Sequence, residues 1–260
     1  MSSGAAQLGL PAGTRALLFD LDGVLTKTAK VHAKAWKEMF DDYLRARASR
    51  QGEDFVAFDG DDYNEYVDGK PRYDGVRSFL ASRGIELPEG DPDDAPDKET
   101  VHGLGNRKNE LVLALIERDG VEPYEGSVRF VEAAVEAGLR RAVVSSSANC
   151  QAVLRAAGIE GLFEARIDAE VADREHLRGK PAPDTFLAGA AALEVTPGEA
   201  VVFEDAVAGV EAGRAGGFGY VVGVDRVDHA EALREHGASV VVADLAELLQ
   251  AGGEAGGAGR

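Results

Sequence analysis

Five short apolar segments constrain the fold of this chain more than any other feature. They are residues 16–19, 141–144, 200–203, 220–222 and 240–242. Segments that are almost entirely apolar are typical of strands buried on both faces, as in a parallel sheet covered by helices. Between the later segments, apolar residues recur at three- and four-residue steps, which is the spacing of a helix face. The alternation predicts an α/β fold with a doubly wound, Rossmann-like parallel sheet at its core.

The first two apolar segments are separated by about 120 residues, and a crossover helix needs far fewer. We therefore expect an inserted domain, with helical spacing of apolar residues near both of its ends. The predicted organisation is an α/β core formed by residues 1–28 and 123–249, with an inserted helical cap domain at 29–122. Residues 250–260 are mostly Gly and Ala and are predicted to form a flexible tail, and residues 1–14 read as a second loose end.

The chain is acidic, with 46 Asp and Glu residues against 28 Lys and Arg residues. Clustered positive charge is needed to bind nucleic acid or an anionic membrane, so neither is expected as a partner. The cap contains two strongly acidic stretches, residues 53–68 and 86–99, which we expect to be solvated loops. A single cysteine, Cys150, excludes a disulfide within the chain. The sequence has no long apolar run and no signal-peptide pattern. Together with the single cysteine, these two absences predict a cytoplasmic protein.

Acidic residues follow the first and third apolar segments. Asp20 and Asp22 come after the first segment, and Glu204 and Asp205 come directly after the third. The carboxyl ends of parallel strands meet at one edge of a sheet, where α/β folds bind ligands. Asp20 and Asp205 can supply the hard oxygen ligands that Mg²⁺ prefers. Asp22 can give a proton to a leaving oxygen and later accept one.

Hydroxyl groups and a lysine complete this set. Ser145, Ser146 and Ser147 follow the second apolar segment, and Lys180 lies in a constrained Gly-Lys-Pro sequence ahead of a predicted helix. A carboxylate can attack a phosphoryl group only if the repulsion between the two anions is offset, and a divalent ion with a lysine does that. Ser145 and Lys180 would then hold the phosphoryl oxygens. Each residue taken singly has an ordinary explanation, such as a helix-capping serine. Their common placement favours phosphoryl chemistry.

These residues, in this order, resemble the four motifs of the haloacid dehalogenase superfamily: Asp20-x-Asp22, Ser145, Lys180 and Glu204-Asp205. The resemblance covers residues 16–249. It implies that Asp20 is a nucleophile that forms an aspartyl-phosphate, that Asp22 is the general acid and base, and that the insert is a mobile cap. It also implies a magnesium ion bound by Asp20, by the backbone oxygen of Asp22 and by Asp205, with Glu204 beside it.

Several cap segments are similar to those of the β-phosphoglucomutase family within this superfamily. They are Thr28-Ala29 with His32 and Trp36, Asp68 to Arg72, and Arg107 to Asn109. In the core, Ser145 to Asn149 and Gly179 to Asp184 match as well. The resemblance implies substrate binding by His32, Trp36, Gly69, Arg72, Lys108, Ser146, Ser147 and Asn149. Two positions depart from the family pattern: Lys27, where many relatives have an acid, and Ala148, where they have a lysine.

The residue types of the cap agree with this implication. His32 and Trp36 are four residues apart, so they share a helix face. The cap also contains the cations Lys70, Arg72, Arg107 and Lys108. In so acidic a chain these cations could form a second phosphate site, and ordinary solvated surface cations are the alternative.

The resemblance implies a magnesium-dependent interconversion of β-D-glucose 1-phosphate and glucose 6-phosphate, through an aspartyl-phosphate and a glucose 1,6-bisphosphate intermediate. Such a mutase needs two phosphate sites and must keep water away from the aspartyl-phosphate. The core residues alone fit a sugar-phosphate or other small-molecule phosphatase equally well. A non-catalytic binding protein that has kept the fold is a further alternative. The expected partner is a small-molecule sugar phosphate, and the expected oligomeric state is a monomer because the cap must move.

Overall fold

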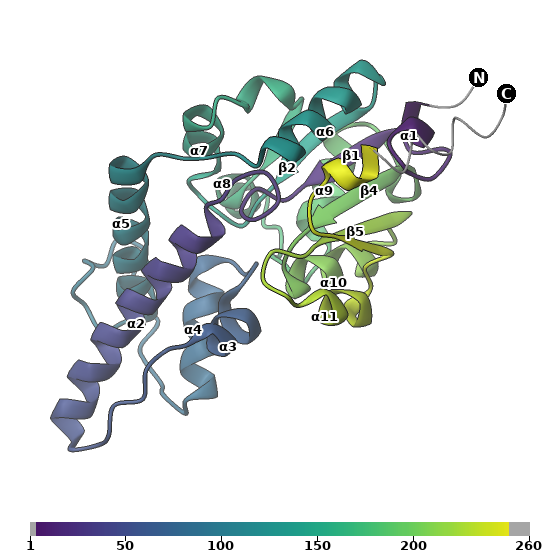
Figure 1. Ribbon diagram of the computed structural model, residues 1–260. Helices are drawn as coiled ribbons and strands as arrows, with labels where there is room; N and C mark the ends of the chain where they lie inside the picture. The colour runs from purple at the N-terminus through teal and green to yellow at the C-terminus, as the bar shows by residue number, and fades with distance from the viewer. Residues whose placement is uncertain (1–3, 250–260) are drawn as a thin grey trace, which may run out of the picture. The chain divides into compact units, whose positions relative to one another are not determined.

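A computed structural model describes residues 4–249 (Figure 1). The chain divides into two compact units. One unit is Thr28–Gly120, and the other combines the chain up to Lys27 with the chain from Val121 onward. We refer to them as the cap unit and the core unit. The predicted domain boundaries, with a cap at 29–122 and a core at 1–28 and 123–249, stay a prediction. The predicted tail at 250–260 lies outside the described residues.

The core unit is built on a six-stranded sheet in which every pairing is parallel. Its strands are β1 (Ala16–Phe19), β2 (Arg140–Val144), β3 (Ala165–Ile167), β4 (Ala200–Glu204), β5 (Tyr220–Val224) and β6 (Val240–Val242). The strand order β3-β2-β1-β4-β5-β6 puts β1 at the centre, between β2 and β4. This arrangement confirms the predicted fold class. Only β3 was not predicted, because it is three residues long and has Arg166 at its middle.

Helices cover both faces of the sheet (Figure 1). They are α6 (Glu125–Glu136), α7 (Cys150–Ala156), α8 (Ala169–Arg174), α9 (Asp184–Ala192), α10 (Val207–Ala215) and α11 (Ala230–His236). Short 3₁₀ turns lie at Glu160–Leu162 and Pro197–Glu199.

Successive side chains of each strand point to opposite faces, so the apolar segments supply two hydrophobic layers. On one face Phe19 stacks on Phe203 with ring centroids 4.5 Å apart, and Phe130 of α6 packs against both rings. On the other face Leu18 and Val202 belong to a buried cluster that includes side chains of α8 to α11. A strand with both faces covered has no polar positions, and this explains the continuous apolar segments.

The N-terminal segment is not a loose end over its described part. Residues Gly4–Gln7 form α1, and the side chains of Ala5, Leu8 and Leu10 are buried. Arg15 donates a hydrogen bond to Glu199 at 2.9 Å. The expectation for residues 1–14 is therefore wrong from residue 4 onward, because a few apolar side chains are enough to hold such a short segment on the core.

The cap unit is helical and has its own aromatic core. Its elements are α2 (Ala29–Gln51), α3 (Gly60–Asp62), the π-helix η1 (Tyr63–Val67), α4 (Arg72–Ser82) and α5 (Val101–Asp119). Phe40 of α2 lies at the centre of this core, 5.3 Å from Trp36, 5.1 Å from Phe58 and 4.2 Å from Phe79 between ring centroids. Helices α2 and α5 pack against each other. None of the helices within residues 4–249 is long and apolar enough to span a membrane.

Most residues of the two acidic stretches are exposed, as expected, but parts of both stretches are buried or helical. Residues 60–67 are helical, and Asp59 and Asp62 form a capping box at the start of α3. Asp62 is buried and pairs with Arg83 at 2.5 Å. Asp94, in the second stretch, is also buried. The expectation of solvated loops is wrong for these residues, because their carboxylates accept hydrogen bonds that compensate burial.

Candidate active site at the carboxyl edge of the sheet

Three carboxylates meet where β1 and β4 end. Asp20 directly follows β1, and its backbone N–H donates to the carbonyl oxygen of Phe203 at 2.9 Å, so the two strands stay paired up to this point. Glu204 is the last residue of β4, and Asp205 follows it. One carboxylate oxygen from each of Asp20, Glu204 and Asp205 lies within 4.8 Å of the others, and all three residues are buried. The parallel register of two neighbouring strands thus brings together acids that are 184 residues apart (204 − 20).

Lys180 lies among these acids. Its Nζ atom is 2.5 Å from Asp20 Oδ1 and 2.5 Å from Glu204 Oε1, and it donates a third hydrogen bond to the carbonyl oxygen of Val144 at 3.2 Å. Only 3% of the residue is exposed. Burial opposes the protonated form, but Asp20 and Glu204 outweigh burial and raise the pKa of Lys180. The lysine is therefore a cation at neutral pH.

Glu204 is an acid with a strongly perturbed pKa. Burial raises its pKa to about 7, and the neighbouring Lys180 opposes this rise. Its Oε2 atom accepts a hydrogen bond from the backbone of Ala206 at 3.1 Å. Three buried carboxylates facing one lysine leave an excess of negative charge. This donor set fits a divalent cation that prefers oxygen ligands.

Two glycines make room for these carboxylates. Gly23 has a φ of +86°, and a Cβ atom at this position would lie 1.7 Å from Asp205 Oδ2. A Cβ atom on Gly209, in the first turn of α10, would lie 1.9 Å from Glu204 Oε1. Only glycine therefore fits at either position.

The serine segment that follows β2 forms two consecutive side-chain turns. Ser145 Oγ accepts from the N–H of Ser147 at 3.1 Å, and Ser147 Oγ accepts from the N–H of Asn149 at 3.1 Å. Ser145 is buried, and Ser146, Ser147 and Asn149 are half-buried. Lys180 contacts the carbonyl oxygen of the residue before Ser145, so these two predicted residues are brought together.

Asp22 is half-buried at the same edge of the sheet. It forms an isolated backbone bridge with Thr26. Burial raises the pKa of Cys150, and the negative charge of Asp22 adds to this rise. Cys150 is the first residue of α7.

Sequence reasoning missed two residues that support this site. His229 Nε2 lies 2.8 Å from the backbone oxygen of Asp205. Arg226 donates to the carbonyl oxygen of Gly23 at 2.8 Å and lies 3.6 Å above the ring of Tyr124. Both residues follow β5, a strand predicted from its apolar segment, so polar residues after that segment were an available signal.

In the cap unit, the structure joins three of the predicted residues. Lys108 Nζ lies 2.9 Å from His32 Nδ1 and 4.8 Å from the centre of the Trp36 ring. A lysine ammonium only donates, so Nδ1 accepts and the proton of the neutral imidazole is on Nε2. Burial lowers the pKa of His32 well below its usual value, and the charges of Lys108 and Arg72 lower it further. His32 is therefore neutral at pH 7, and Lys108 is buried beside it.

The other predicted cap cations do not all gather at one place. Arg72 packs against α5. A Cβ atom placed on Gly105 of α5 would lie 3.4 Å from the Cδ atom of Arg72. Gly105 and Lys108 are three residues apart and share a helix face. Lys70, by contrast, donates to Ser78 at 2.9 Å, and Arg107 donates to the carbonyl oxygen of Pro96 at 2.8 Å.

Gly69 precedes this region in the left-handed conformation, with a φ of +70°. The residue belongs to the turn between η1 and α4. Glycine adopts this conformation without the steric cost that other residues incur, so the role of Gly69 is to permit the backbone conformation of this turn.

Comparison with known proteins agrees with this geometry. Residues 14–217 match the family described as haloacid dehalogenase-like hydrolase. The chain is 58% identical over 246 residues to β-phosphoglucomutase of Mycobacterium bovis, which covers 93% of this chain and 94% of the relative. It is 32% identical to fructose-1-phosphate phosphatase YqaB of Escherichia coli, over 77% of this chain and 92% of the relative.

A solved structure shows the same fold. The crystal structure of β-phosphoglucomutase from Clostridium difficile superimposes with a TM-score of 0.70 at 24% identity, covering 93% of this chain and 98% of that one. The family match spans most of the chain and includes each of the four motifs described above. The chain therefore belongs to the haloacid dehalogenase-like hydrolase family.

Proposed function

We propose that this protein is a magnesium-dependent mutase that interconverts β-D-glucose 1-phosphate and glucose 6-phosphate, with glucose 1,6-bisphosphate as the intermediate. The observation that carries the proposal is the buried cluster of Asp20, Lys180, Glu204 and Asp205 in a chain 58% identical to a β-phosphoglucomutase. We further propose that the protein acts as a monomer on small sugar phosphates.

In the proposed first half-reaction, a carboxylate oxygen of Asp20 forms a bond to one phosphorus of glucose 1,6-bisphosphate while the bond from that phosphorus to the sugar oxygen breaks, which leaves a glucose monophosphate. Asp22 gives its proton to that oxygen. Lys180 holds the Asp20 carboxylate through Oδ1 and, with Ser145, stabilises the phosphoryl oxygens. Asp20, Asp205 and the backbone oxygen of Asp22 would hold a magnesium ion, with Glu204 beside them, and the ion supplies positive charge against the phosphoryl oxygens.

In the second half-reaction, the free 6-hydroxyl of a bound β-glucose 1-phosphate attacks the phosphorus of the aspartyl-phosphate, which forms glucose 1,6-bisphosphate. Asp22 takes the proton of that hydroxyl, and the bond from Asp20 to phosphorus breaks, which restores both carboxyl groups. We propose that Ser146, Ser147 and Asn149 contact substrate at this end. The sugar hydroxyl must reach the phosphorus in place of water, because attack by water would make the enzyme a phosphatase.

The proposed role of the cap unit is to bind the phosphate that does not react. Arg72 and Lys108 are two cations near one neutral histidine, His32, and a guanidinium can bind phosphate through two parallel hydrogen bonds. Trp36 would support Lys108, and Gly69 would shape the turn that leads to Arg72.

The test is to incubate the purified protein with Mg²⁺, β-glucose 1-phosphate and a trace of glucose 1,6-bisphosphate. Glucose 6-phosphate and free phosphate are then measured together. Fast formation of glucose 6-phosphate with little free phosphate is the expected result. Free phosphate without the isomer would contradict the mutase proposal.

The second candidate function is a sugar-phosphate phosphatase with the same core residues. It is favoured by the 32% identity to a fructose-1-phosphate phosphatase. The same experiment separates the two functions, because only hydrolysis releases phosphate in proportion to substrate consumed.

A further inference from the structure

Arg72 has a neutral side-chain partner, whereas two other arginines of the cap pair with carboxylates. Arg77 pairs with Glu89, and Arg83 pairs with Asp62. Arg72 Nη1 instead lies 3.4 Å from Oδ1 of Asn106, and its guanidinium lies 5.3 Å from the centre of the Tyr73 ring. Among residues 4–249, no carboxylate forms an ion pair with it. In a chain with a net charge of −18, this arrangement leaves the charge of Arg72 uncompensated.

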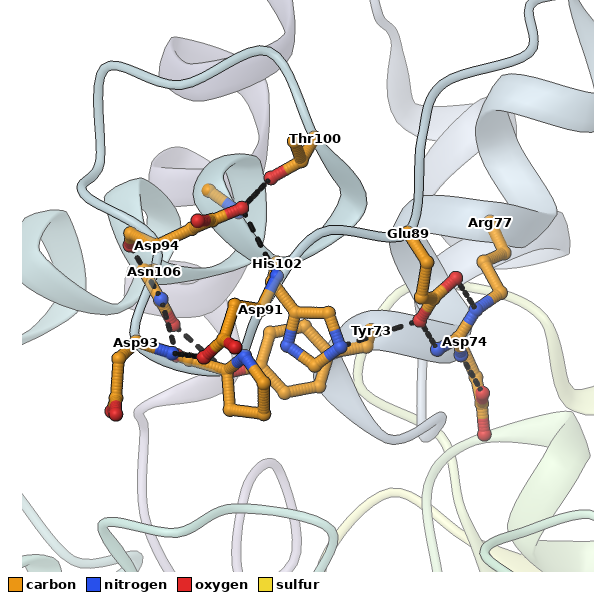
Figure 2. Close-up of polar contacts among 12 residues, drawn as sticks. Tyr73, Asp74, Arg77, Glu89, Asp91, Asp93, Asp94, Thr100, His102 and Asn106 are labelled. Carbon is orange, nitrogen blue, oxygen red and sulfur yellow. Dashed lines mark hydrogen bonds and ion pairs between the residues drawn. The ribbon is translucent and has the colours of Figure 1, made fainter.

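Asn106 is held in one orientation by the acidic stretch at residues 86–99. Its Nδ2 group donates to the carbonyl oxygens of Pro92 and Asp94, both at 2.9 Å. Its Oδ1 atom also accepts from the hydroxyl of Tyr73 at 2.8 Å (Figure 2). Carbonyl oxygens only accept and a guanidinium only donates, so the amide can point in one direction only. All donor and acceptor positions of the Asn106 side chain are used.

The segment that holds Asn106 is itself fixed by Asp94. The carboxylate of Asp94 accepts from Lys98 Nζ at 2.6 Å, from Thr100 Oγ1 at 2.7 Å and from the N–H of Asp91 at 3.1 Å (Figure 2). The residue is only 7% exposed. These bonds close the turn whose carbonyl oxygens accept from Asn106, so the acidic stretch is a rigid support.

Tyr73 is fixed against α5. Its ring lies 4.1 Å from the ring of His102 between centroids (Figure 2). A Cβ atom on Gly105 would lie 2.6 Å from the Tyr73 ring, so glycine at this position permits the close approach. Arg72 is the neighbour of Tyr73 at the start of α4, and the anchored ring limits where the guanidinium can lie.

The geometry points to Asn106 as a positioning residue for Arg72, with residues 91–98 as the scaffold that orients Asn106. The inference rests on the proposed function, in which Arg72 binds the non-reacting phosphate. A carboxylate at position 106 would form a charge-assisted ion pair with Arg72 and compete with that phosphate. An amide orients the guanidinium through a neutral contact and leaves its charge available to the substrate.

The experiment compares Asn106→Asp, Arg72→Ala and the double variant. Asn106→Asp should lower kcat/KM for β-glucose 1-phosphate at least tenfold, mainly by raising KM, and should change acetyl phosphate hydrolysis less than twofold. The double variant should be no worse than Arg72→Ala alone, because Asn106 acts through Arg72. Glu99→Gln is the matched control, since its carboxylate pairs with Arg50 at the end of the same stretch, and it should behave as the wild type.

Two further measurements keep the inference testable. Tyr73→Phe removes only the hydroxyl that donates to Asn106, and it should raise the same KM two- to fivefold even if Asn106→Asp does not fold. Binding of glucose 1,6-bisphosphate is measured by calorimetry in proteins that also carry Asp20→Asn. Asn106→Asp and Tyr73→Phe should each weaken this binding, as they raise KM. Losses that add in the double variant, or equal losses with acetyl phosphate, would overturn the inference, as would unchanged KM values in both single variants.

Failure of the proposed mutase function would give a different result from failure of the inference about Asn106. If the wild type releases phosphate but forms no isomer, the mutase proposal fails, and Asn106→Asp, Arg72→Ala and the double variant are then compared by their binding of glucose 1,6-bisphosphate. Non-additive losses there would still support Asn106 as a positioning residue. Absence of bisphosphate binding to the Asp20→Asn protein would overturn the inference itself.

Discussion

At the scale of single residues, the candidate active site depends on one buried lysine. Lys180 contacts Asp20, Glu204 and a backbone carbonyl oxygen, all within 3.2 Å. Two carboxylates this close and this deeply buried would both favour protonation if the lysine were absent. Lys180 thus orients the proposed nucleophile and places a positive charge beside it.

Asp20→Asn is expected to abolish turnover, because the amide cannot attack phosphorus and no other side chain is proposed as a nucleophile. Activity with β-glucose 1-phosphate and with acetyl phosphate should both be measured. The thermal midpoint of the variant should stay near that of the wild type, which would exclude unfolding as the cause. Substantial residual turnover with either substrate would remove Asp20 from this role.

Gly23→Ala is expected to weaken Mg²⁺ binding. The Mg²⁺ concentration that gives half-maximal activity should rise at least tenfold. The new Cβ atom would lie 1.7 Å from Asp205 Oδ2, so this carboxylate must move. Gly52→Ala is a matched control, because Gly52 also has a positive φ but nothing lies within 4 Å of its Cβ position. The control should lose about 1 kcal/mol of stability and no Mg²⁺ affinity.

At the scale of elements, the segment between α4 and α5 shows how an acidic stretch becomes structure. Asp94 accepts three hydrogen bonds, and Thr100 caps α5 by accepting from the N–H of Gly103. Hydrogen bonds from Lys98 and Thr100, followed by that from the backbone of Asp91, lower the pKa of Asp94 to about 2. The carboxylate form is therefore the one that stabilises this segment.

The order of this segment should depend on pH through Asp94. A folded-state pKa of about 2 lies below the ordinary value of 3.8, so the stabilisation is complete above pH 4 and is lost as the pH falls through about 2. Hydrogen exchange of residues 90–98, corrected for intrinsic rates, should be faster in Asp94→Asn than in the wild type at pH 7. The two proteins should converge near pH 2. An equal difference at pH 7 and pH 2 would contradict this assignment.

At the scale of the whole molecule, the two units contain different parts of the proposed chemistry. The core unit contains the carboxylate cluster and Lys180, and the cap unit contains Arg72, Lys108 and His32. A substrate with one phosphate needs only the first set, whereas a bisphosphate needs both. The two sets can therefore be tested separately.

Arg72→Ala is expected to reduce mutase turnover at least tenfold more than it reduces acetyl phosphate hydrolysis. The physical reason is that acetyl phosphate has no second phosphate for the guanidinium to bind. Both activities are measured on the same preparation, so a folding defect would lower them together. Equal losses would exclude Arg72 from binding the second phosphate.

Removal of divalent metal should stop both activities, because excess negative charge in the carboxylate cluster repels the phosphoryl group. Treatment with EDTA followed by gel filtration is expected to reduce turnover to background, and added Mg²⁺ should restore it. Full activity in the metal-free protein would contradict the proposed cofactor.

The sequence by itself determined the parallel sheet and the positions of Asp20, Asp22, Ser145, Glu204 and Asp205 at strand ends. Apolar runs encode burial on both faces, and polar residues directly after them must lie at the carboxyl edge. Strand β3 escaped this reasoning because its apolar pattern is interrupted by Arg166. His229 and Arg226 also follow a predicted strand, but their contacts are with backbone oxygens, so their residue types alone did not single them out.

Only the tertiary structure decided which side chains meet. Lys180 bonds to an aspartate 160 residues away, and Asn106 contacts an arginine 34 residues away in another helix. Such contacts depend on strand register, on helix packing and on the space left by glycines such as Gly23 and Gly105. Local patterns report the period and burial of one segment, whereas distances between segments follow from the packing of the whole chain.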